Sequence, residues 1–285
     1  MLIHQAVLRS LRPLKDMRRE LSRRDVADLH AVSTAGLPTE IAPLAETLNQ
    51  LLTRLDTLLA NQRRFLADAA HELNTPLAAV KLQAQLVRRM PEPERIAALD
   101  ELDRGIERTA HLVSQLLQLA RLEPDARRPE RSMVRLDQLV REVVVSFAAR
   151  AAEHRIDLGL TSAEPAVVWG DAQALRAMLD NLVDNALRYA GAGARVDLAL
   201  RAEDRHAVVE VIDNGPGIAA ADRERVQERF VRLDQGQSTG SGLGLAIVKS
   251  IADLHAARFE MADAPSGGLL VRIRFPMVAD TPSPT

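Results

Sequence analysis

The chain lacks cysteine altogether, and this absence removes several kinds of chemistry at once. Disulfide bonds, zinc sites built on thiolates and thiol nucleophiles all require cysteine, so none of them is available. Aromatic residues are also scarce, with one Trp, one Tyr and five Phe among 285 residues. A chain of this length holds about two globular units at the usual domain size, and we expect their cores to be mostly aliphatic.

Long apolar runs and a large excess of one charge are absent too. No stretch reaches the ~18–20 consecutive apolar residues that a membrane-spanning helix needs. The first residues carry Arg9 and Arg12 without the apolar run and cleavage site of a secretory signal. With 37 basic and 39 acidic residues, the formal net charge is -2, which disfavours nucleic acid as a partner. We therefore expect this chain to be soluble, with no nucleic-acid partner.

Residues 1–43 are arginine-rich and interrupted by proline and glycine, which predicts a short helix, a loop and the start of a second helix. From there leucines recur at alternating spacings of four and three residues, at Leu44, Leu48, Leu51, Leu55 and Leu58. This spacing forms the narrow seam of a coiled coil. One interpretation is a long helix packed within its own chain. The interpretation that we favour is a parallel pairing with the same helix of a second copy.

The helix is expected to run through His71 to a kink at Pro76 and to resume as far as about Met90. The sequence from Met90 to Pro93 predicts a turn. A second amphipathic helix follows, whose apolar face is Leu99, Leu102, Ile106, Ala110, Val113, Leu117 and Ala120. Residues 61–123 therefore predict a helical hairpin. One hairpin cannot cover both apolar stripes, whereas two hairpins make a four-helix bundle, so we expect a homodimer.

Residues 124–133 are polar and punctuated by proline, which predicts a linker, and a mixed α/β domain is expected over residues 134–276. Its helices are predicted at about 137–153, 172–189, 222–229 and 243–256. Its strands are predicted at about 156–161, 166–169, 195–202, 206–213, 258–263 and 268–275. Residues 277–285 predict a disordered tail.

Four short motifs carry residues suited to chemistry, and the first is AAHELNTPL at residues 69–77. A neutral imidazole is a good nucleophile near pH 7, and Glu72 beside His71 could accept the proton of one ring nitrogen. Thr75, one helical turn after His71 and on the same face, could orient a water. Taken alone, a lone histidine on a helix is more often an ordinary surface residue.

The second motif is LDNLVDNALRYA at residues 179–190. Asn181 and Asn185 share one helical face, and asparagine is only a middling helix former. An amide oxygen is a suitable hard ligand for Mg²⁺ that is bound mainly to phosphates. Arg188 could pair with phosphate oxygens. The alternative is a solvated helical face, which is weakened because apolar residues occupy the opposite side.

The third motif is VIDNGPGI at residues 211–218. Asp213 ends a predicted strand and could accept a hydrogen bond from an exocyclic amine. Gly215 and Gly217 permit close backbone approach. A simple strand-to-helix turn would use the same residue types.

The fourth motif is STGSGLGLAIV at residues 238–248. Gly240, Gly242 and Gly244 precede an apolar helix, and the free N–H groups at such a helix start can cradle phosphate. The spacing matches neither the P-loop nor the dinucleotide-binding fingerprint.

Together and in this order, the four motifs resemble those of bacterial two-component sensor histidine kinases, over about residues 61–276. AAHELNTPL resembles the H box, NLVDNALRY the N box, DNGPG the G1 box, ERF at 228–230 the F box and GSGLGL the G2 box. Residues 1–60 resemble much of a HAMP linker. The resemblance implies an all-α hairpin that forms a dimeric four-helix bundle, followed by an α/β sandwich ATP-binding domain of the Bergerat type, shared with gyrase-type ATPases.

The resemblance also implies roles for single residues. His71 would attack the γ-phosphate of ATP, Glu72 would be the general base and Thr75 would assist dephosphorylation of the partner. Asn185 would bind Mg²⁺, and Asp213 would accept the adenine amine. The residues around the nucleotide would be Asn181, Asn185, Arg188, Tyr189, Asp213, Gly215, Gly217, Phe230, Gly240, Gly242, Leu243 and Gly244. The phosphoryl group would pass to an Asp of a response regulator. The chain would be the cytoplasmic portion of an inner-membrane sensor whose membrane spans lie upstream.

The sequence departs from the family pattern in three places. Asn74 stands where the family usually has Arg, which removes a positive charge beside His71. Gln227 stands where the F box usually begins with Phe, so Phe230 is its only aromatic residue. The segment between Phe230 and Gly240 is short, which predicts a small nucleotide lid. None of these departures deletes a catalytic group, so we still predict a kinase.

Two other functions remain open at this point. A gyrase-like ATPase places Glu one helical turn before the Mg²⁺-binding Asn, and here that position is Asn181, which cannot act as a base. A dimeric nucleotide-binding scaffold without phosphotransfer is the other alternative. His71, Glu72 and Asn185 argue against the scaffold, whereas Gln227 is compatible with it.

Overall fold

The computed structural model describes residues 28–34, 41–88, 90–122, 130–233 and 240–278. The chain divides into two compact units, residues 1–72 and 73–285. The division differs from the predicted boundary at residue 60 because one long helix continues through both units. The helix expected before residue 28, the loop around residue 37, most of the linker and most of the tail lie outside the described residues.

In the first unit, residues 28–34 lie along the start of helix α3 (Ala42–Val87). The Asn49 side chain holds this segment by two bonds. Its Oδ1 accepts the backbone N–H of Val32 at 2.7 Å, and its Nδ2 donates to the Val32 carbonyl at 3.0 Å. Val32 and Ala45 are buried beside these bonds. The extended segment is therefore fastened to the helix by both polar and apolar contacts.

Helix α3 is unbroken through Pro76 and ends at Val87 rather than at about Met90. A proline removes one backbone donor, and here that loss does not end the helix. The leucines of the predicted seam are exposed in the single chain, at Leu44 (58%), Leu51 (59%), Leu55 (45%) and Leu58 (37%). Such a narrow apolar row is typical of a helix that pairs with another helix.

The second unit begins with residues 73–87 of α3 and continues with helix α4 (Glu92–Arg121). Helix α4 starts directly after Pro91, so the connection between the helices covers residues 88–91 and lies two residues earlier than the predicted turn. Pro93 sits in the first turn of α4, where proline is tolerated. The two helices approach closely at Gly105. A Cβ there would stand 3.0 Å from Gln83 Oε1 and 3.2 Å from Val80 Cγ2. The predicted hairpin is therefore present.

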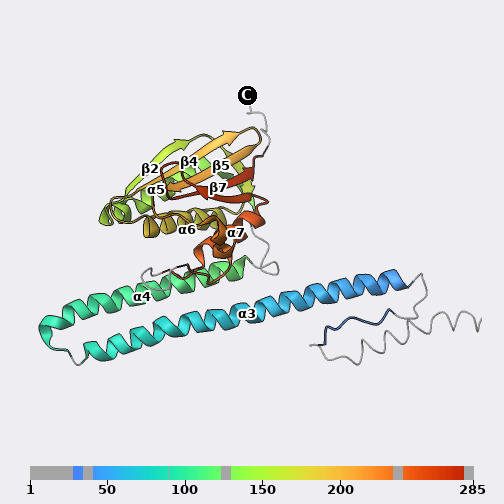
Figure 1. Cartoon of the computed structure of the whole chain (residues 1–285), viewed down its shortest axis with the longest axis horizontal. Helices are drawn as coiled ribbons and strands as arrows, with labels where there is room; N and C mark the ends of the chain where they lie inside the picture. Colours follow the sequence, from blue (N-terminus) through green and yellow to red (C-terminus); the bar gives the residue numbers. More distant parts are fainter. Residues whose placement is uncertain (1–27, 35–40, 89, 123–129, 234–239, 279–285) are drawn as a thin grey trace, which may run out of the picture. The chain divides into compact units, whose positions relative to one another are not determined.

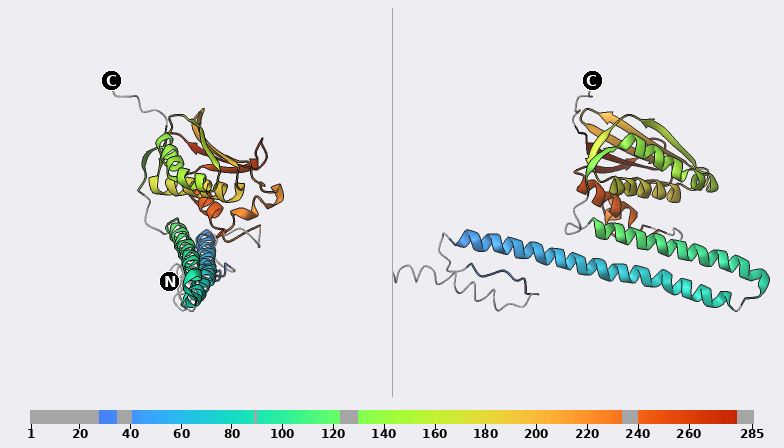
Figure 2. Two further views of the ribbon diagram at one scale, coloured as in Figure 1. Left: turned by 90° about the vertical axis from the view of Figure 1, so that its left-hand side faces the viewer. Right: turned by 180° about the vertical axis from the view of Figure 1, so that it is seen from behind.

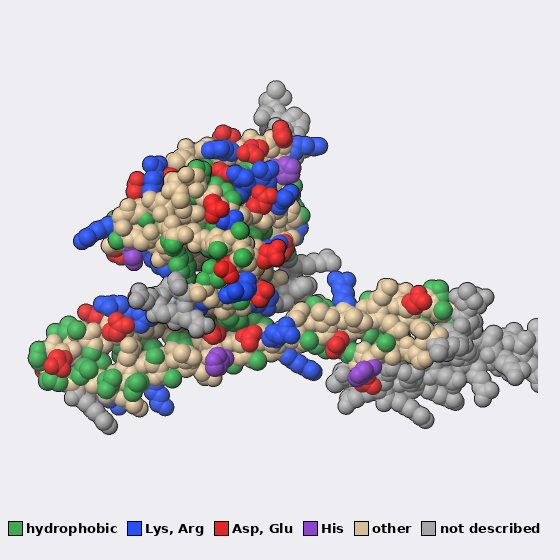
Figure 3. All heavy atoms as spheres, viewed as in Figure 1, with side chains coloured by type: hydrophobic (Ala, Val, Ile, Leu, Met, Phe, Trp, Pro, Cys, Tyr) green, Lys and Arg blue, Asp and Glu red, His purple; other side chains and the backbone are tan. Residues whose placement is uncertain are grey.

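Helix α4 has two apolar faces, of which the sequence analysis identified one. The predicted face remains exposed, at Leu99, Ile106, Val113 and Leu117, and apolar side chains gather along this hairpin in Figure 3. The other face is buried, at Leu112, Gln115, Leu116 and Leu119, and α4 contacts helix α7 (Gly244–Leu254). The exposed face agrees with the expectation that one hairpin cannot cover its own apolar surface. Among the described residues, no helix combines the length and apolarity needed to cross a membrane.

The α/β domain is built on a five-stranded sheet with the order β2-β4-β5-β7-β6. These strands are β2 (Asp157–Ala163), β4 (Arg195–Glu203), β5 (His206–Asp213), β6 (Arg258–Asp263) and β7 (Leu269–Pro276). Strands β2 and β4 are parallel, and the other neighbours are antiparallel. Helices α5 (Leu136–Glu153), α6 (Ala172–Ala190) and α7 lie together against one face of the sheet (Figures 1 and 2). The predicted α/β sandwich is confirmed.

Two details differ from the prediction. A strand β1 (Ser132–Arg135) pairs antiparallel with β3 (Val167–Gly170), so the domain begins inside the predicted linker 124–133. Its four residues follow a polar, proline-punctuated run and show no pattern of their own. The helix predicted at 222–229 is replaced by two short 3₁₀ helices, Ala220–Asp222 and Arg225–Gln227. Only Val226 in this stretch is buried, so a regular helix would have no apolar stripe to cover.

The core is aliphatic, as the scarcity of aromatic residues predicts. Its largest fully buried side chains are Leu, Ile and Met, together with one aromatic residue, Phe275. Helix α6 contributes Leu175, Met178 and Leu179 to this core. Burial of each such side chain stabilises the fold by about 1.5–3 kcal/mol, and the apolar layer between helices and sheet fixes the orientation of α6.

Burial of His255 makes the stability of this domain depend on pH. Its Nε2 accepts the backbone N–H of Asp171 at 3.0 Å, and its Nδ1 donates to the Ile251 carbonyl at 2.8 Å, so the ring is neutral. Burial lowers the pKa of His255, and nearby Arg131 lowers it further. Because the unfolded chain takes up this proton at about pH 6.5 and the folded chain only below that, stability is lost as the pH falls.

We predict that the urea midpoint of unfolding, followed by the fluorescence of Trp169, is lower at pH 6.0 than at pH 7.5. In His255→Gln this difference should become smaller, because one of the two histidines among the described residues whose pKa burial lowers is gone, while His111 remains. The exposed His206→Gln serves as control and should retain it. An unchanged pH dependence in His255→Gln would contradict the assignment.

Candidate active site

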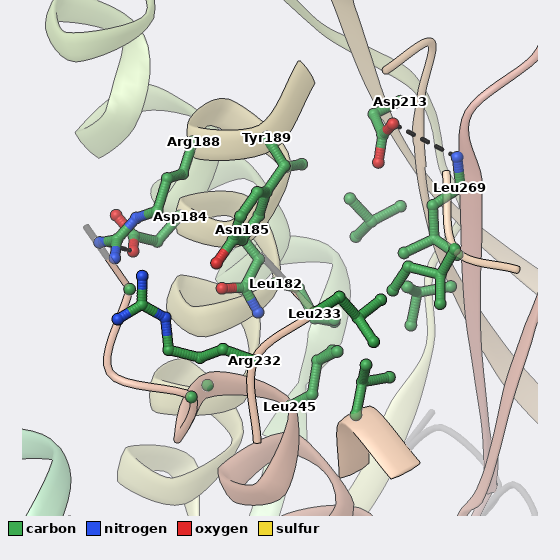
Figure 4. A pocket seen from close by; sticks show the side chains of 18 of the residues that line it. Leu182, Asp184, Asn185, Arg188, Tyr189, Asp213, Arg232, Leu233, Leu245 and Leu269 are labelled. Carbon is green, nitrogen blue, oxygen red and sulfur yellow. Dashed lines mark hydrogen bonds and ion pairs between the residues drawn. The ribbon is translucent and has the colours of Figure 1, made fainter. Parts of the chain in front are cut away.

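A cavity of about 170 Å³ opens beside α6, between the end of β5 and the loop before α7. Its walls bring together predicted residues that are far apart in sequence: Asn185, Arg188, Tyr189, Asp213, Gly217, Gly240, Gly242 and Gly244. In Figure 4, Asp213 lies at one end, Arg188 and Asp184 lie at the other, and Asn185 and Leu233 lie between them. Apolar side chains, among them Leu182, Val211 and Leu245, complete the walls. The cavity therefore has a carboxylate end, an apolar middle and a cationic end.

Helix α6 supplies one wall because its two faces differ. Asp171 caps its start, and its Oδ1 accepts the backbone N–H groups of Gln173 and Ala174 at 2.8 and 3.1 Å. The apolar face packs into the core, so the helix cannot rotate without exposing it. The opposite face then presents Asn185 and Arg188 to the cavity.

Asp213 forms the carboxylate end of the cavity. Its Oδ1 accepts the backbone N–H of Gly215 at 2.9 Å and that of Leu269 at 3.3 Å, the second of which is drawn in Figure 4. Burial raises the pKa of the Asp213 carboxyl, and the two backbone donors act in the opposite direction. Within the described residues no donor reaches Oδ2, so this oxygen is available to a ligand that carries an N–H group.

Two glycines allow the chain to close around Asp213. A Cβ on Gly215 would stand 2.9 Å from the Ala190 Cα, and one on Gly268 would stand 2.2 Å from the Asp213 carbonyl oxygen. Gly268 also has a φ of +91°, in the left-handed region. Only glycine therefore fits at position 268, where the turn before β7 presents Leu269 N–H to the carboxylate.

The glycine-rich loop lies against α6 at similarly short distances. A Cβ on Gly244 would stand 2.9 Å from Asn185 Nδ2, and one on Gly240 would stand 2.7 Å from the Tyr189 hydroxyl. Gly242 has a φ of +70° and packs on the backbone of Phe230, whose N–H donates to the Gly242 carbonyl at 3.0 Å. These contacts place the loop, and the N-terminus of α7 behind it, beside Asn185.

Asp184 organises the cationic end. This buried carboxylate accepts a bond from Arg188 Nη2 at 2.8 Å and is also paired with Arg150 of α5. Arg188 is thereby held near the glycine-rich loop, since a Cβ on Gly240 would lie 3.5 Å from its Nη1. Two arginines around one carboxylate leave a net positive charge, which suits an anionic ligand.

Four of the residues predicted around the nucleotide do not line the cavity. Leu243 is fully buried beneath the loop, while Gly215 and Phe230 support the cavity wall through their backbones. The side chain of Asn181 lies on α6 but bonds to Ala177 and Gln115. Asp184, Ser241 and Gln115 were not predicted, because a polar side chain on a helix or in a loop resembles an ordinary surface residue. Leu269 was not predicted because it contributes a backbone N–H, which leaves no side-chain pattern.

The residues of the first motif lie on α3. His71 and Glu72 belong to the first unit and Thr75 to the second. His71 and Thr75 are exposed, and Glu72 is half-buried. The predicted spacing on one helix is thus present, on a different part of the chain from the cavity.

A metal ion at this site would depend on few protein ligands. Among the described residues no group of three or more His, Asp or Glu side chains could hold a metal ion. Asn185, however, places an amide beside the loop, and Mg²⁺ is commonly held by one or two protein oxygens together with phosphates and water. The donor set fits a magnesium ion that arrives with a phosphate ligand.

Three family models match this chain. Residues 61–125 match the His Kinase A (phospho-acceptor) domain, and residues 170–279 match the histidine kinase-, DNA gyrase B- and HSP90-like ATPase. Residues 11–64 match the HAMP domain of PhoQ-like sensor proteins. The matches occur in the order expected from the motifs.

Among similar proteins, the chain is 38% identical to the sensor protein kinase PmrB of Pseudomonas aeruginosa, over 96% of this chain and 58% of PmrB. It is 36% identical to the sensor protein BasS of Salmonella typhimurium, over 91% of this chain and 72% of BasS. The chain thus spans about three fifths of the length of PmrB. The histidine kinase AdeS of Acinetobacter baumannii shares the fold, with a TM-score of 0.60, 24% identity and coverage of 73% of this chain and 98% of that structure.

The turn at Gly267 and Gly268 offers a matched test of the closure around Asp213. Both glycines have positive φ values, but a Cβ on Gly267 meets nothing within 4 Å. We expect Gly267→Ala to lower the free energy of unfolding by about 1–2 kcal/mol, from backbone strain alone. Gly268→Ala adds a backbone clash and should lower it by at least about 2 kcal/mol more. Equal losses in urea unfolding would show that the close approach to Asp213 is not a constraint.

Proposed function

Because the chain belongs to the sensor histidine kinases of two-component systems, we propose that it transfers the γ-phosphoryl group of ATP to His71 and then to an aspartate of a response regulator. The observation that carries this proposal is the cavity itself. It joins the Asp213 carboxylate to a glycine-rich loop that lies on Asn185, and apolar side chains line the space between them. This arrangement suits a purine at one end and phosphates at the other.

The nucleotide is proposed to lie along the cavity. Asp213 Oδ2 accepts a hydrogen bond from the exocyclic amine of adenine, and the cavity walls at Val211 and Leu269 contact the adenine ring. The phosphates lie on Gly240, Gly242 and Gly244, where backbone N–H groups and Arg188 offset their charge. Asn185 is the proposed ligand of Mg²⁺, which when bound would neutralise charge on the phosphate oxygens.

The reaction needs a nucleophile from the helical hairpin. A ring nitrogen of His71 attacks the γ-phosphorus in line, the N–P bond forms as the bond to the bridging oxygen breaks, and ADP leaves. Glu72 accepts the proton of the other ring nitrogen. We propose that Thr75 orients water during dephosphorylation of the response regulator.

A gyrase-like ATPase is less well supported. Hydrolysis needs a base one helical turn before Asn185, and that position holds Asn181. The Asn181 amide donates to the Ala177 carbonyl and accepts a bond from Gln115. Neither bond would make the amide a base. A nucleotide-binding scaffold remains the alternative against which the labelling experiment is designed.

We propose that the chain acts as a homodimer. The exposed leucine seam of α3 and the exposed apolar face of α4 would both be covered by a second copy. The match to the HAMP domain supports a cytoplasmic location in which this chain receives a signal from a sensor in the inner membrane.

The first prediction concerns the phosphoacceptor. Incubation with ATP labelled at the γ-phosphate and Mg²⁺ should label the wild-type chain with an acid-labile, alkali-stable phosphoryl group. His71→Gln should lose this label while it still binds nucleotide, because the cavity is untouched. Equal labelling of the two proteins would overturn the role of His71. Nucleotide binding without any label in the wild type would favour the scaffold.

Asn185→Ala is the companion variant. It keeps His71 but removes the proposed magnesium ligand, so we expect labelling to fall by at least about tenfold, in the range of one lost metal contact. Asn61→Ala, at an exposed asparagine of α3 outside both the His71 motif and the cavity, is the control for the substitution itself. Labelling in Asn185→Ala that equals the wild type would rule out the ligand role.

The second prediction concerns the dimer. Light scattering at micromolar concentration should give twice the chain mass. Leu51→Glu places a charge in the seam and should raise the dissociation constant at least about tenfold. Gln50→Glu makes a comparable change at an exposed position next to the seam and should leave it unchanged. A monomeric wild type would contradict the proposal.

A further inference from the structure

Gln115 is the polar side chain among the residues that α4 buries in the structure. It is 5% exposed and lies on the same face as Leu112, Leu116 and Leu119. A buried amide destabilises a fold unless its donor and acceptor are both satisfied. The hydrogen-bond partners of the Gln115 amide therefore indicate its role.

Both ends of the Gln115 amide are hydrogen-bonded to the candidate active site. Its Nε2 donates to Asn181 Oδ1 at 3.1 Å, and its Oε1 accepts the hydroxyl of Ser241 at 2.7 Å. Ser241 in turn accepts the backbone N–H of Leu243 at 3.2 Å. One side chain of the hairpin thus bridges α6 and the glycine-rich loop.

This bridge changes what the site presents to a ligand. Both polar atoms of the Asn181 amide are engaged, because its Nδ2 also donates to the Ala177 carbonyl at 2.8 Å. The Ser241 hydroxyl points to α4 instead of donating to a phosphate. Gln115 itself lines the cavity at the end where Arg188 lies. At the proposed phosphate end, the polar groups of Gln115, Asn181 and Ser241 are therefore hydrogen-bonded within this trio and not to a ligand.

Gln115 also has room to move. Gln115, Ser241, Asp184 and Arg188 line a second cavity of about 230 Å³, whose other walls include His111 and Arg150. The bond between Gln115 and Ser241 lies where the two cavities meet. A side chain released from Ser241 can enter this polar space without leaving its amide unsolvated.

We propose that Gln115 is a positioning residue that holds the phosphate end of the site in an arrangement that nucleotide must displace. This inference rests on the proposed ATP site. The β- and γ-phosphates compete with Gln115 for Ser241 and for the space beside Asn181. A ligand shifts such an equilibrium only by the difference in its affinity for the two arrangements. Nucleotide entry therefore releases α4 from the site, and by reciprocity an α4 that is drawn away favours nucleotide binding.

The test measures binding of adenosine and of a non-hydrolysable ATP analogue by calorimetry, with the full chain and Mg²⁺. Gln115→Ala should lower the dissociation constant of the analogue about tenfold, the effect expected for one or two neutral hydrogen bonds. The dissociation constant of adenosine should stay unchanged, because Asp213 lies at the other end. Gln115→Leu removes both hydrogen bonds without adding charge or a large cavity, so we expect a gain of similar size.

Gln118→Ala is the matched control, on the same helix and with an Oε1 that accepts no hydrogen bond within the described residues. It should bind both ligands as the wild type does. Weaker or unchanged analogue binding in Gln115→Ala and Gln115→Leu, with wild-type binding intact, would overturn this inference alone. Failure of the wild type to bind the analogue would instead overturn the proposed function. Melting temperatures measured on each variant verify that the binding data come from folded protein.

Discussion

The close approach of a glycine-rich loop to α6 is the constraint on which the site depends. Only glycine fits at Gly242, which has a φ of +70° and where a Cβ would stand 2.7 Å from the Phe230 backbone, while Cβ atoms at Gly240 and Gly244 would displace the ends of the Tyr189 and Asn185 side chains. The buried apolar face of α6 fixes the helix, and the helix then fixes where the loop can go. The cavity between Asp213 and Arg188 is what this packing leaves open.

A second consequence is that the ends of the site are held by different means. Asp213 is set by backbone donors from Gly215 and Leu269, which follow from the tight turns around it. Arg188 is set by a carboxylate, Asp184, which it shares with Arg150. In the proposed function, the end fixed by backbone donors would hold the base and the ion-paired end would hold the phosphates.

Much of this arrangement could be predicted from the sequence, because local patterns determine it. The alternating and valine-rich runs of β4 and β5, the amphipathic α6 and the glycines before α7 each carry their own signal. What could not be predicted depends on contacts between distant segments. From the sequence alone, Gln115 resembles a solvent-exposed helical residue. Only the fold brings Asn181 and Ser241 within hydrogen-bond distance of it. The strand β1 is visible only through its pairing with β3, and Gly268 is constrained only by Asp213.

The central claim is that one cavity holds the whole nucleotide, with adenine on Asp213 and phosphates on the glycine-rich loop. A crystal structure of the chain with a non-hydrolysable ATP analogue and Mg²⁺ tests this claim most directly. The account predicts the adenine amine within hydrogen-bond distance of Asp213 Oδ2 and the phosphates beside Gly242, with the metal on Asn185. Analogue density outside this cavity, or a reversed nucleotide with its phosphates at Asp213, would contradict it.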